Sequence, residues 1–301
     1  MKELKALAKR NTRLFFKDKA MFFTSLITPV ILLVLYGTFL GKIYRQSFES
    51  ALPDGVRVAD NLIDGCVGGQ LMSSILAVSC ITVAFCSNML MVQDKANGTI
   101  RDLTISPVKP SVLALAYYFS TLIVTLIVCC TAATICLVYM AVVGWYLSVA
   151  DVLLMLLDIF LLVMFGTALS SIINVFLSTQ GQISAVGTIV SSGYGFISGA
   201  YMPISSFSKG LQKVISFLPG TYGTSLLRNH ALRGTFAEME SVGFPAEVVN
   251  GIKDSIDCNL CFFGNKVEIP LMYAILGGAV MLLVMAYIFI NMVKIKKHST
   301  V

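Results

Sequence analysis

Few side chains in this 301-residue sequence have the type and spacing that catalysis requires. The two histidines, His230 and His298, are too few for a histidine-based metal site. The sequence contains no G-x-x-x-x-G-K-[ST] phosphate loop, no G-x-S-x-G nucleophile turn and no H-E-x-x-H zinc motif. We therefore expect no enzymatic activity, no ATP hydrolysis and no bound metal or cofactor in this chain.

Eight cysteines are present, and six of them lie in apolar runs, where a thiol behaves as a small hydrophobe. The other two, Cys258 and Cys261, form a C-x-x-C pair in a polar segment. A four-ligand zinc site would need a second pair, which the sequence lacks. Two interpretations stay open, a local disulfide in an oxidising compartment or two free thiols.

Asp158 is the one acidic residue well inside an apolar run. A carboxylate at bilayer depth costs on the order of a few kcal/mol, so it should face the bundle interior or water, or be protonated. It could belong to a substrate path, or it could reach polar surroundings near Asp151 at the outer edge. We favour the second interpretation, because no basic residue lies in any apolar run to pair with it.

The most specific pattern is a polar loop at residues 94–107, between two long apolar runs. Thr99 can cap a short helix, with Asp102 three residues later in the arrangement of a capping box. Ile100 and Leu103 then share one face, and a proline ends the helix. A short exposed helix with two apolar side chains is suited to docking into a groove of a partner protein.

Composition places these segments in a membrane. Apolar residues make up 56% of the chain and charged residues only 13%, about half the share of a soluble domain. No Lys or Arg occurs between Lys109 and Lys209. The net charge of +6 arises from basic residues at the ends of apolar runs, which is typical of membrane topology signals and not of nucleic-acid binding.

Runs long enough to cross a bilayer predict six transmembrane helices, because a helix needs about 20 apolar residues to span the hydrocarbon core. The predicted spans are approximately 20–40, 66–91, 111–143, 152–178, 184–204 and 269–293. Basic residues favour the cytoplasmic side. Seven precede the first span, three lie in the 92–110 loop and three follow the last span, whereas residues 205–268 balance six bases with six acids. We therefore expect a multi-pass protein with both termini in the cytoplasm and residues 205–268 outside.

Three further segments complete the predicted architecture, which is a single all-α membrane domain, 1–301. Residues 1–19 carry apolar side chains at helical spacing opposite several lysines, which predicts a helix lying in the inner headgroup layer and contacting lipid. Residues 205–268 are too long and too apolar for a simple loop, and we expect short broken helices there that enter the outer leaflet or cap the bundle.

The fifth span carries a small residue at every fourth position, namely Gly187, Ser191, Gly195 and Gly199. This pattern lets helix backbones approach closely. The close contact could lie within one subunit, at a subunit interface or along the wall of a transport pathway.

The 94–107 loop resembles the coupling helix of the type-2 ABC exporter permeases, which contacts the nucleotide-binding subunit. In that family an acidic residue, Gly-Thr, Leu and Pro recur at this spacing. They match Asp94, Gly98, Thr99, Leu103 and Pro107 here, with Ile100 and Arg101 inside the same helix, although Asp94 stands where Glu is usual. A second match resembles the family's external re-entrant segment and includes Pro203, Pro219, Tyr222 and Arg228.

This resemblance covers essentially the whole chain. It implies the membrane subunit of an ATP-driven exporter in a prokaryotic plasma membrane, paired with a separate ABC ATPase subunit that binds ATP and Mg, and with a second permease copy or paralogue. The cargo it implies is an amphipathic drug, a peptide antibiotic or a lipid-linked molecule, with a polysaccharide or teichoic-acid-type exporter as the alternative. A secondary transporter would need more intramembrane ionisable residues, and a sensor would not need the docking loop.

Overall fold

The computed structural model of the chain describes residues 2–35, 38, 41–42, 45–46, 59–106 and 108–298. Almost all of these residues are helical, with one short antiparallel hairpin. The elements in chain order are α1 (Lys2–Lys17), α2 (Lys19–Leu35), α4 (Asp60–Ser87), α5 (Met89–Ala96), α6 (Thr99–Ile105), α7 (Pro110–Val143), α8 (Val149–Phe176), α9 (Gln180–Ile197), η2 (Ile204–Ser206), α10 (Lys209–Ile215), α11 (Pro219–Ser241), α12 (Ala246–Ser255), β1 (Cys261–Phe262), β2 (Asn265–Lys266) and α13 (Ile269–His298).

Local sequence signals set the beginnings of the long helices. Proline is the first residue of α7 and α11, where its missing N–H costs nothing and its fixed φ suits a helix. Capping boxes begin α8, where Ser148 pairs with Asp151, and α9, where Thr179 pairs with Gln182. These side chains satisfy backbone N–H groups that a helix leaves without partners at its start.

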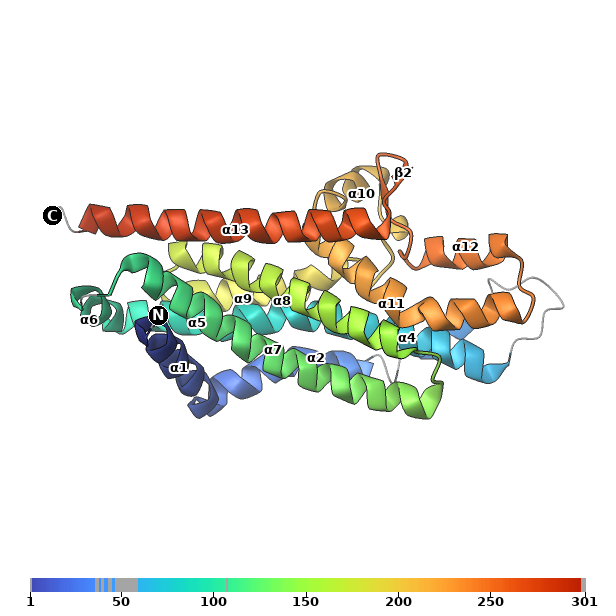
Figure 1. The fold of residues 1–301 in the computed structure, drawn as a ribbon, viewed down its shortest axis with the longest axis horizontal. Coiled ribbons are helices and arrows are strands. Elements are labelled where there is room, and N and C mark those ends of the chain that lie inside the picture. Colours follow the sequence, from blue (N-terminus) through green and yellow to red (C-terminus); the bar gives the residue numbers. More distant parts are fainter. Residues whose placement is uncertain are drawn as a thin grey trace.

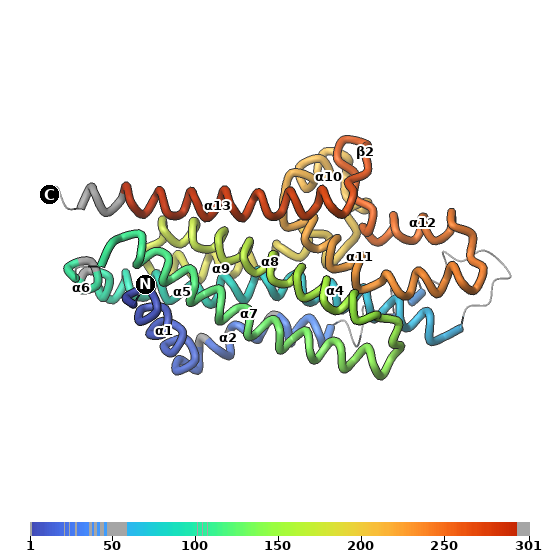
Figure 2. The backbone as a smooth tube through the Cα atoms, viewed as in Figure 1, coloured from blue at the N-terminus to red at the C-terminus, as the bar shows by residue number. Residues whose placement is uncertain are grey.

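The molecule is an elongated bundle with α4 at its centre (Figures 1 and 2). Helices α2, α7, α8, α9 and α11 all pack against α4. In the apolar stretch of α4 and α5, 89% of the residues are buried, against 17% in α13 on the outside of the bundle. The N- and C-termini and α6 lie toward one end of the bundle, and α12 lies toward the other (Figure 1).

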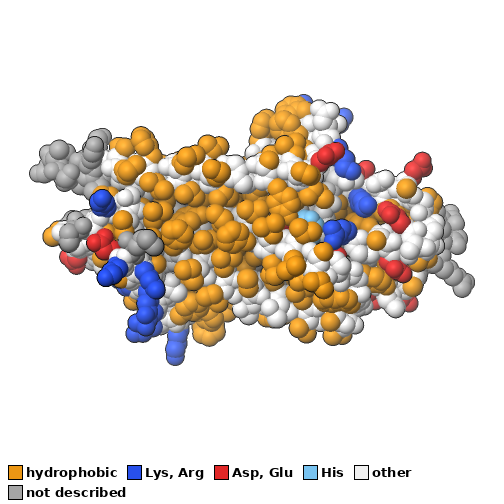
Figure 3. Space-filling model, in the orientation of Figure 1, with side chains coloured by type: hydrophobic (Ala, Val, Ile, Leu, Met, Phe, Trp, Pro, Cys, Tyr) orange, Lys and Arg blue, Asp and Glu red, His pale blue; other side chains and the backbone are white. Residues whose placement is uncertain are grey.

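Four helical stretches in the described part of the chain are long and apolar enough to cross a membrane. They are Asp60–Ala96, Pro110–Val143, Val149–Phe176 and Ile269–Val293. Their exposed apolar side chains form a broad belt around the middle of the visible face, with charged side chains gathered toward the two ends (Figure 3). The prediction of a helical, membrane-embedded protein is therefore confirmed.

The predicted first and fifth spans correspond to helices that are not among these four stretches, because they are too short or not apolar enough in the described residues. In the first, part of 20–40 lies outside the described residues, and the apolar helix Ser25–Leu35 is short. In the fifth, α9 has 18 residues but many of them are Ser, Thr, Gly or Gln, and much of its surface is exposed. The count of six spans stays a prediction.

The segment 205–268 differs from the expected set of short helices. It contains the 23-residue helix α11, which packs against α4, α8 and α13, and it ends in the β1–β2 hairpin. Both ends of this helix could be anticipated from Pro219 and the polar residues near Ser241, but its depth of burial could not. Fifteen of its residues are buried, including polar ones such as Arg228 and His230.

Helix α1 packs against the bundle along one side. Its buried residues, Ala8, Asn11 and Phe15, recur at helical spacing and face protein, since α1 packs mainly on α7. Leu14 and Phe16 are more than one third exposed. The lysines of α1 are exposed (Figure 3), and its placement in the inner headgroup layer stays a prediction.

Candidate functional site

The candidate coupling loop consists of two helices, α5 and α6, joined by a glycine turn. Gly98 has φ +79°, in the left-handed region that glycine adopts without strain, and it immediately precedes α6. The predicted turn at Gly98 is therefore present. The predicted capping box is wrong, because Gly98 and not Thr99 is the capping residue, and no side chain caps this end of the helix.

Asp94 is turned into the protein. Its side chain accepts hydrogen bonds from Arg10 Nη1 at 2.9 Å and from the Tyr117 hydroxyl at 2.6 Å, and the residue is only 6% exposed. The carboxylate beside Arg10 raises the pKa of that guanidinium above its ordinary value, despite partial burial. Asp94 thus joins α5 to α1 and α7, and the exposed contact with a partner predicted for it is replaced by an internal one.

The most exposed apolar residue of α6 is one that the sequence pattern did not select. Leu103 is half-buried and packs against the core, and Ile100 is also half-buried. Ile105, the last residue of α6, is 83% exposed, and Asp102 is exposed beside it. The i, i+3 pairing missed Ile105 because it compares only residues on one helical face. Pro107 and the side chain of Arg101 lie outside the described residues.

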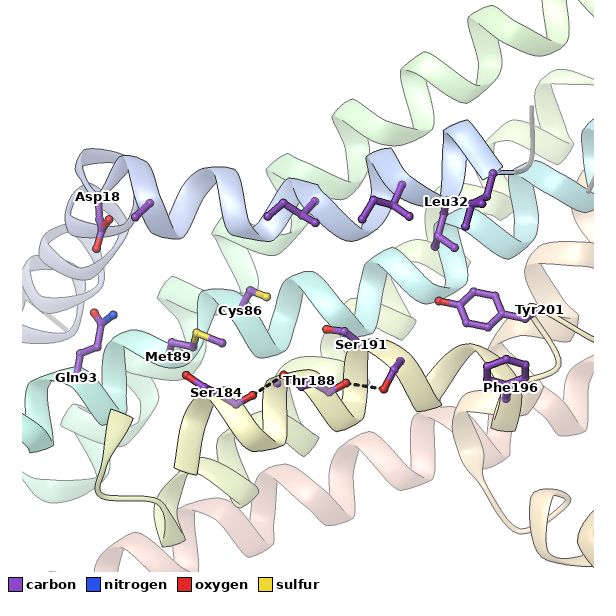
Figure 4. Close-up of a pocket in the computed structure, with 16 residues that line it drawn as sticks. Asp18, Leu32, Cys86, Met89, Gln93, Ser184, Thr188, Ser191, Phe196 and Tyr201 are labelled. Atoms are coloured by element: carbon purple, nitrogen blue, oxygen red, sulfur yellow. Dashed lines mark hydrogen bonds between the residues drawn. The ribbon is translucent and has the colours of Figure 1, made fainter. Parts of the chain in front are cut away.

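A groove of about 980 Å³ lies between α2 and α9, with α4 and α5 behind it (Figure 4). Asp18 and Gln93 line the end nearest α1, and Phe196 and Tyr201 line the other end. Between them the α2 wall is aliphatic, and the α9 wall carries four hydroxyl side chains, Ser184, Thr188, Ser191 and Ser192. The groove therefore combines one apolar wall with one weakly polar wall and has no basic side chain among the residues that line it in the described part of the chain.

Hydrogen bonds within α9 determine whether its hydroxyl groups can act as donors or as acceptors toward a molecule in the groove. Thr188 donates to the carbonyl of Ser184 at 2.8 Å, and Ser192 donates to the carbonyl of Thr188 at 2.7 Å (Figure 4). Because these protons are already donated, the oxygens are left as acceptors. Such a wall can accept a few hydrogen bonds from a bound molecule, and because its groups are neutral, no charged side chain has to be removed from water when the molecule binds.

The small residues predicted on the fifth span divide between two roles. A side chain at Gly195 would come within 2.2 Å of the Tyr201 ring, and one at Gly187 within 3.1 Å of Met89. Gly195 therefore serves close packing within the chain, whereas Gly187 both contacts Met89 and lines the groove. Ser191 lines the groove, and Gly199 lies beyond α9 in a turn with φ +72°.

Asp158 is fully buried and does not line the groove. Its two carboxylate oxygens lie 2.6 Å from His230 Nδ1 on α11 and 2.6 Å from the hydroxyl of Tyr273 on α13. The search for a partner of Asp158 in the sequence considered only the apolar runs, whereas His230 reaches it from α11, in the segment predicted to lie outside. Asp158 therefore joins three helices, and its polar surroundings come from the protein.

The second set of predicted residues converges around a buried arginine. Arg228 Nη2 donates to the carbonyl of Gly199 at 2.9 Å and to the Ser74 hydroxyl at 3.2 Å, and the guanidinium lies 3.6 Å from Asp257. The Asp257 carboxylate also accepts a hydrogen bond from the N–H of Ile204 at 2.8 Å. Burial raises the pKa of Asp257, and the charge of Arg228 acts in the opposite direction.

Further contacts hold the segment between α9 and α12 together. Tyr222 donates its hydroxyl to the carbonyl of Ser216 at 2.6 Å, Pro219 begins α11, and Pro203 precedes η2. Arg228 connects this segment to α4 and to the turn after α9. Sequence reasoning selected Arg228 through the resemblance but missed Asp257, which no local spacing relates to it.

Cys258 is buried and Cys261 is exposed in β1, and both are free thiols in the structure. Within the described residues, no group of three or more His, Cys, Asp or Glu side chains could hold a metal ion.

A bundle of long apolar helices with an exposed short helix at one end and a groove between α2 and α9 is the architecture of a helical membrane protein. A family model for the ABC-2 type transporter matches residues 2–231, which is most of the chain. The chain therefore belongs to the ABC-2 type transporter family and is an ABC transporter permease. Comparison with curated proteins gives no match.

Proposed function

We propose that this chain is the membrane subunit of an ATP-driven exporter, driven by a separate ATPase subunit that docks on α6. The observation that carries the proposal is the exposed tip of α6 at the end of the bundle that holds both termini. An 83% exposed isoleucine on a short helix is suited to insertion into an apolar pocket of a partner. Because the family is one of ABC transporters, the partner that fits is the ABC ATPase subunit, which binds the ATP and Mg.

The groove between α2 and α9 is the proposed path for cargo. One wall is aliphatic and the other offers hydroxyl oxygens, which suits an amphipathic drug, a peptide antibiotic or a lipid-linked molecule better than a free sugar or an ion. A second permease copy or a paralogue facing this groove would close it into a cavity. ATP binding would bring the two ATPase subunits together, move α6 and change the access of this cavity from inside to outside.

The test is co-purification with the ATPase subunit, with Ile105→Asp as the disrupting variant. A charge at this tip would enter an apolar pocket without a partner, costing on the order of several kcal/mol, so the complex should dissociate. The matched control is Val242→Asp, since Val242 is also an exposed aliphatic residue (62%) but follows α11 toward the other end of the bundle. Retention of the ATPase subunit and of ATP hydrolysis by Ile105→Asp at normal abundance would contradict the proposal.

A further inference from the structure

The helix that leads from the bundle core to the coupling helix is interrupted at Asn88. Helix α4 ends at Ser87 and α5 begins at Met89, so α5 is a separate helical segment. Buried Asn88 donates from Nδ2 to the hydroxyls of Ser170 (3.0 Å) and Ser171 (2.9 Å) on α8. Asn174 on the same helix donates to the backbone carbonyl of Asn88 at 3.0 Å. The interruption is therefore fixed to α8 by three hydrogen bonds.

Lys95 attaches the other end of α5 to the same helix, about two turns beyond Asn88. Its Nζ donates to the carbonyls of Asn174 at 2.6 Å, Val175 at 3.0 Å and Leu177 at 3.2 Å. These carbonyls belong to the last turn of α8 and to the residue that follows it, where the negative end of the helix dipole lies. A single lysine thus caps α8 from a neighbouring helix, and each of its bonds is charge-assisted.

The end of α8 leads directly into the wall of the groove. Leu177 follows α8, and the Thr179–Gln182 capping box begins α9 two residues later. Helix α9 then carries the hydroxyl residues that line the groove. A displacement of Lys95 would therefore move the carbonyls at the end of α8 to which it is bonded. Because only a short connection joins α8 to α9, the movement would then displace α9 and the groove wall.

We propose that Lys95 is a positioning residue that passes the movement of the coupling helix to α9, with Asn88 as the fixed point of α5. This inference rests on the proposed function, because it requires an ATPase subunit that moves α6. The neighbouring residue supports the division of roles: Asp94 bonds Arg10 of α1 and Tyr117 of α7, whereas Lys95 bonds α8. Adjacent residues on α5 thus connect the coupling helix to different helices of the bundle, and of these two residues only Lys95 bonds the helix that continues into α9.

The experiment measures hydrogen exchange by mass spectrometry in the complex of the full chain with its ATPase subunit, with and without ATP and vanadate. In the unmodified protein we expect nucleotide to change exchange both at residues 99–105 and at residues 177–183. In Lys95→Met, which keeps the length of the side chain without its charge, the change at 99–105 should persist. The change at 177–183 should fall about fivefold or more, the scale of a typical coupling between sites.

Two further variants separate positioning from general stability. Lys95→Arg keeps a positively charged donor and should retain most of the exchange response at residues 177–183. Lys95→Gln lacks the charge and should lose that response. It replaces Lys95→Met if that variant does not reach the membrane. The matched control is Lys109→Met, since Lys109 is an exposed lysine of the same loop that precedes α7. It should respond as the unmodified protein does.

The possible failures are distinguishable. If nucleotide changes exchange at neither segment of the unmodified complex, the proposed function is wrong, and the inference falls with it. If both segments respond in the unmodified complex and residues 177–183 still respond in Lys95→Met and Lys95→Gln, the proposed function stands and the role of Lys95 is refuted.

Discussion

At position 98 the backbone, and not the side-chain environment, limits what the protein can accept. Gly98 has φ +79°, and no atom lies within 4 Å of the place where a side chain would begin. Gly98→Val should therefore cost about 1–2 kcal/mol of local strain without any clash, and this strain should tilt α6 or unwind its first turn. Gly98→Asn should be milder, because Asn adopts the left-handed region more readily.

Partner affinity is the measurement for this pair, since α6 would be displaced while the bundle remains intact. We expect weaker binding of the ATPase subunit by Gly98→Val than by Gly98→Asn, at equal membrane abundance. Equal binding by the two variants would show that the turn at Gly98 does not determine the position of α6.

The buried pair of Arg228 and Asp257 makes a second prediction at the scale of residues. Removal of one partner leaves a buried charge without compensation, so Arg228→Met and Asp257→Asn should each destabilise the protein by about 3–5 kcal/mol. The double variant should be less destabilised than the sum of the two by about 1–3 kcal/mol. Asn is suited to position 257 because that residue has φ +58°.

Thermal unfolding in detergent, followed by labelling of thiols, measures this cycle directly, because six of the eight cysteines are buried and become accessible on unfolding. Glu240→Gln is the matched control. Glu240 lies 3.8 Å from Lys253 and its side chain is 55% exposed, so its pair should contribute only about 0–1 kcal/mol. A simple sum of the two single effects would show that Arg228 and Asp257 do not interact.

The residues that sequence reasoning missed share a physical cause. Arg10 pairs with Asp94 across 84 positions and His230 with Asp158 across 72, so no local spacing relates them. The turn at Gly98 was predictable, because a conformational requirement belongs to one residue and its neighbours. The burial of Asp94 was not, since it depends on how α1 and α7 pack around α5.

At the scale of elements, the contact between Arg10 and Asp94 predicts that α1 is anchored to α5. Arg10→Met removes two hydrogen bonds of 2.9 and 3.4 Å from a carboxylate that is only 8% exposed, a loss of about 1–3 kcal/mol. Helix α1 should loosen, and the measurement is amide hydrogen exchange over residues 2–17. Arg13→Met is the control, because Arg13 is exposed on the same helix and its change should leave exchange unaltered.

The pH dependence of this anchor follows from the direction of the pKa shift. The pKa of Arg10 is raised by the hydrogen bond to Asp94, so the contribution of its charge to stability is fully present below the ordinary value of about 12. It is lost only as pH rises through the raised value. Protection of residues 2–17 should therefore not decline between about pH 7 and pH 9 through loss of this charge.

The long apolar helices were predictable from sequence because composition and length decide them. The predicted runs 111–143 and 152–178 correspond to Pro110–Val143 and Val149–Phe176. The helices around the groove were harder to predict, because α9 mixes hydroxyl and apolar residues and satisfies part of its polarity by bonds within the helix. Helix α11 was harder still, since buried polar residues such as Arg228 and His230 bond partners that are distant in sequence, Ser74 on α4 and Asp158 on α8.

At the scale of the whole molecule, the distribution of charge predicts which end of the bundle faces the cytoplasm. The end with α6 and both termini carries the N-terminal helix, where seven basic residues precede the first apolar run, and basic flanks remain inside. The opposite end, with α12 and the end of α11, balances acids and bases. We therefore predict that Asp102 on α6 is cytoplasmic and Ser241 at the end of α11 is external.

Labelling of intact cells with a membrane-impermeant maleimide tests this orientation at two exposed positions. The background is Cys261→Ser, because Cys261 is an exposed native thiol in the outer segment, whereas exposed Cys130 lies within the apolar helix α7, where a polar reagent in water does not reach it. In that background Ser241→Cys should be labelled in intact cells and Asp102→Cys only after the membrane is opened. The unaltered background should show little labelling in either condition, and Cys261 itself, when restored, should label from outside because it shares the outer segment with Ser241. The reverse pattern, with Asp102→Cys labelled in intact cells and Ser241→Cys protected, would invert the molecule and place α6 on the side of the membrane where no ATP-driven subunit could reach it.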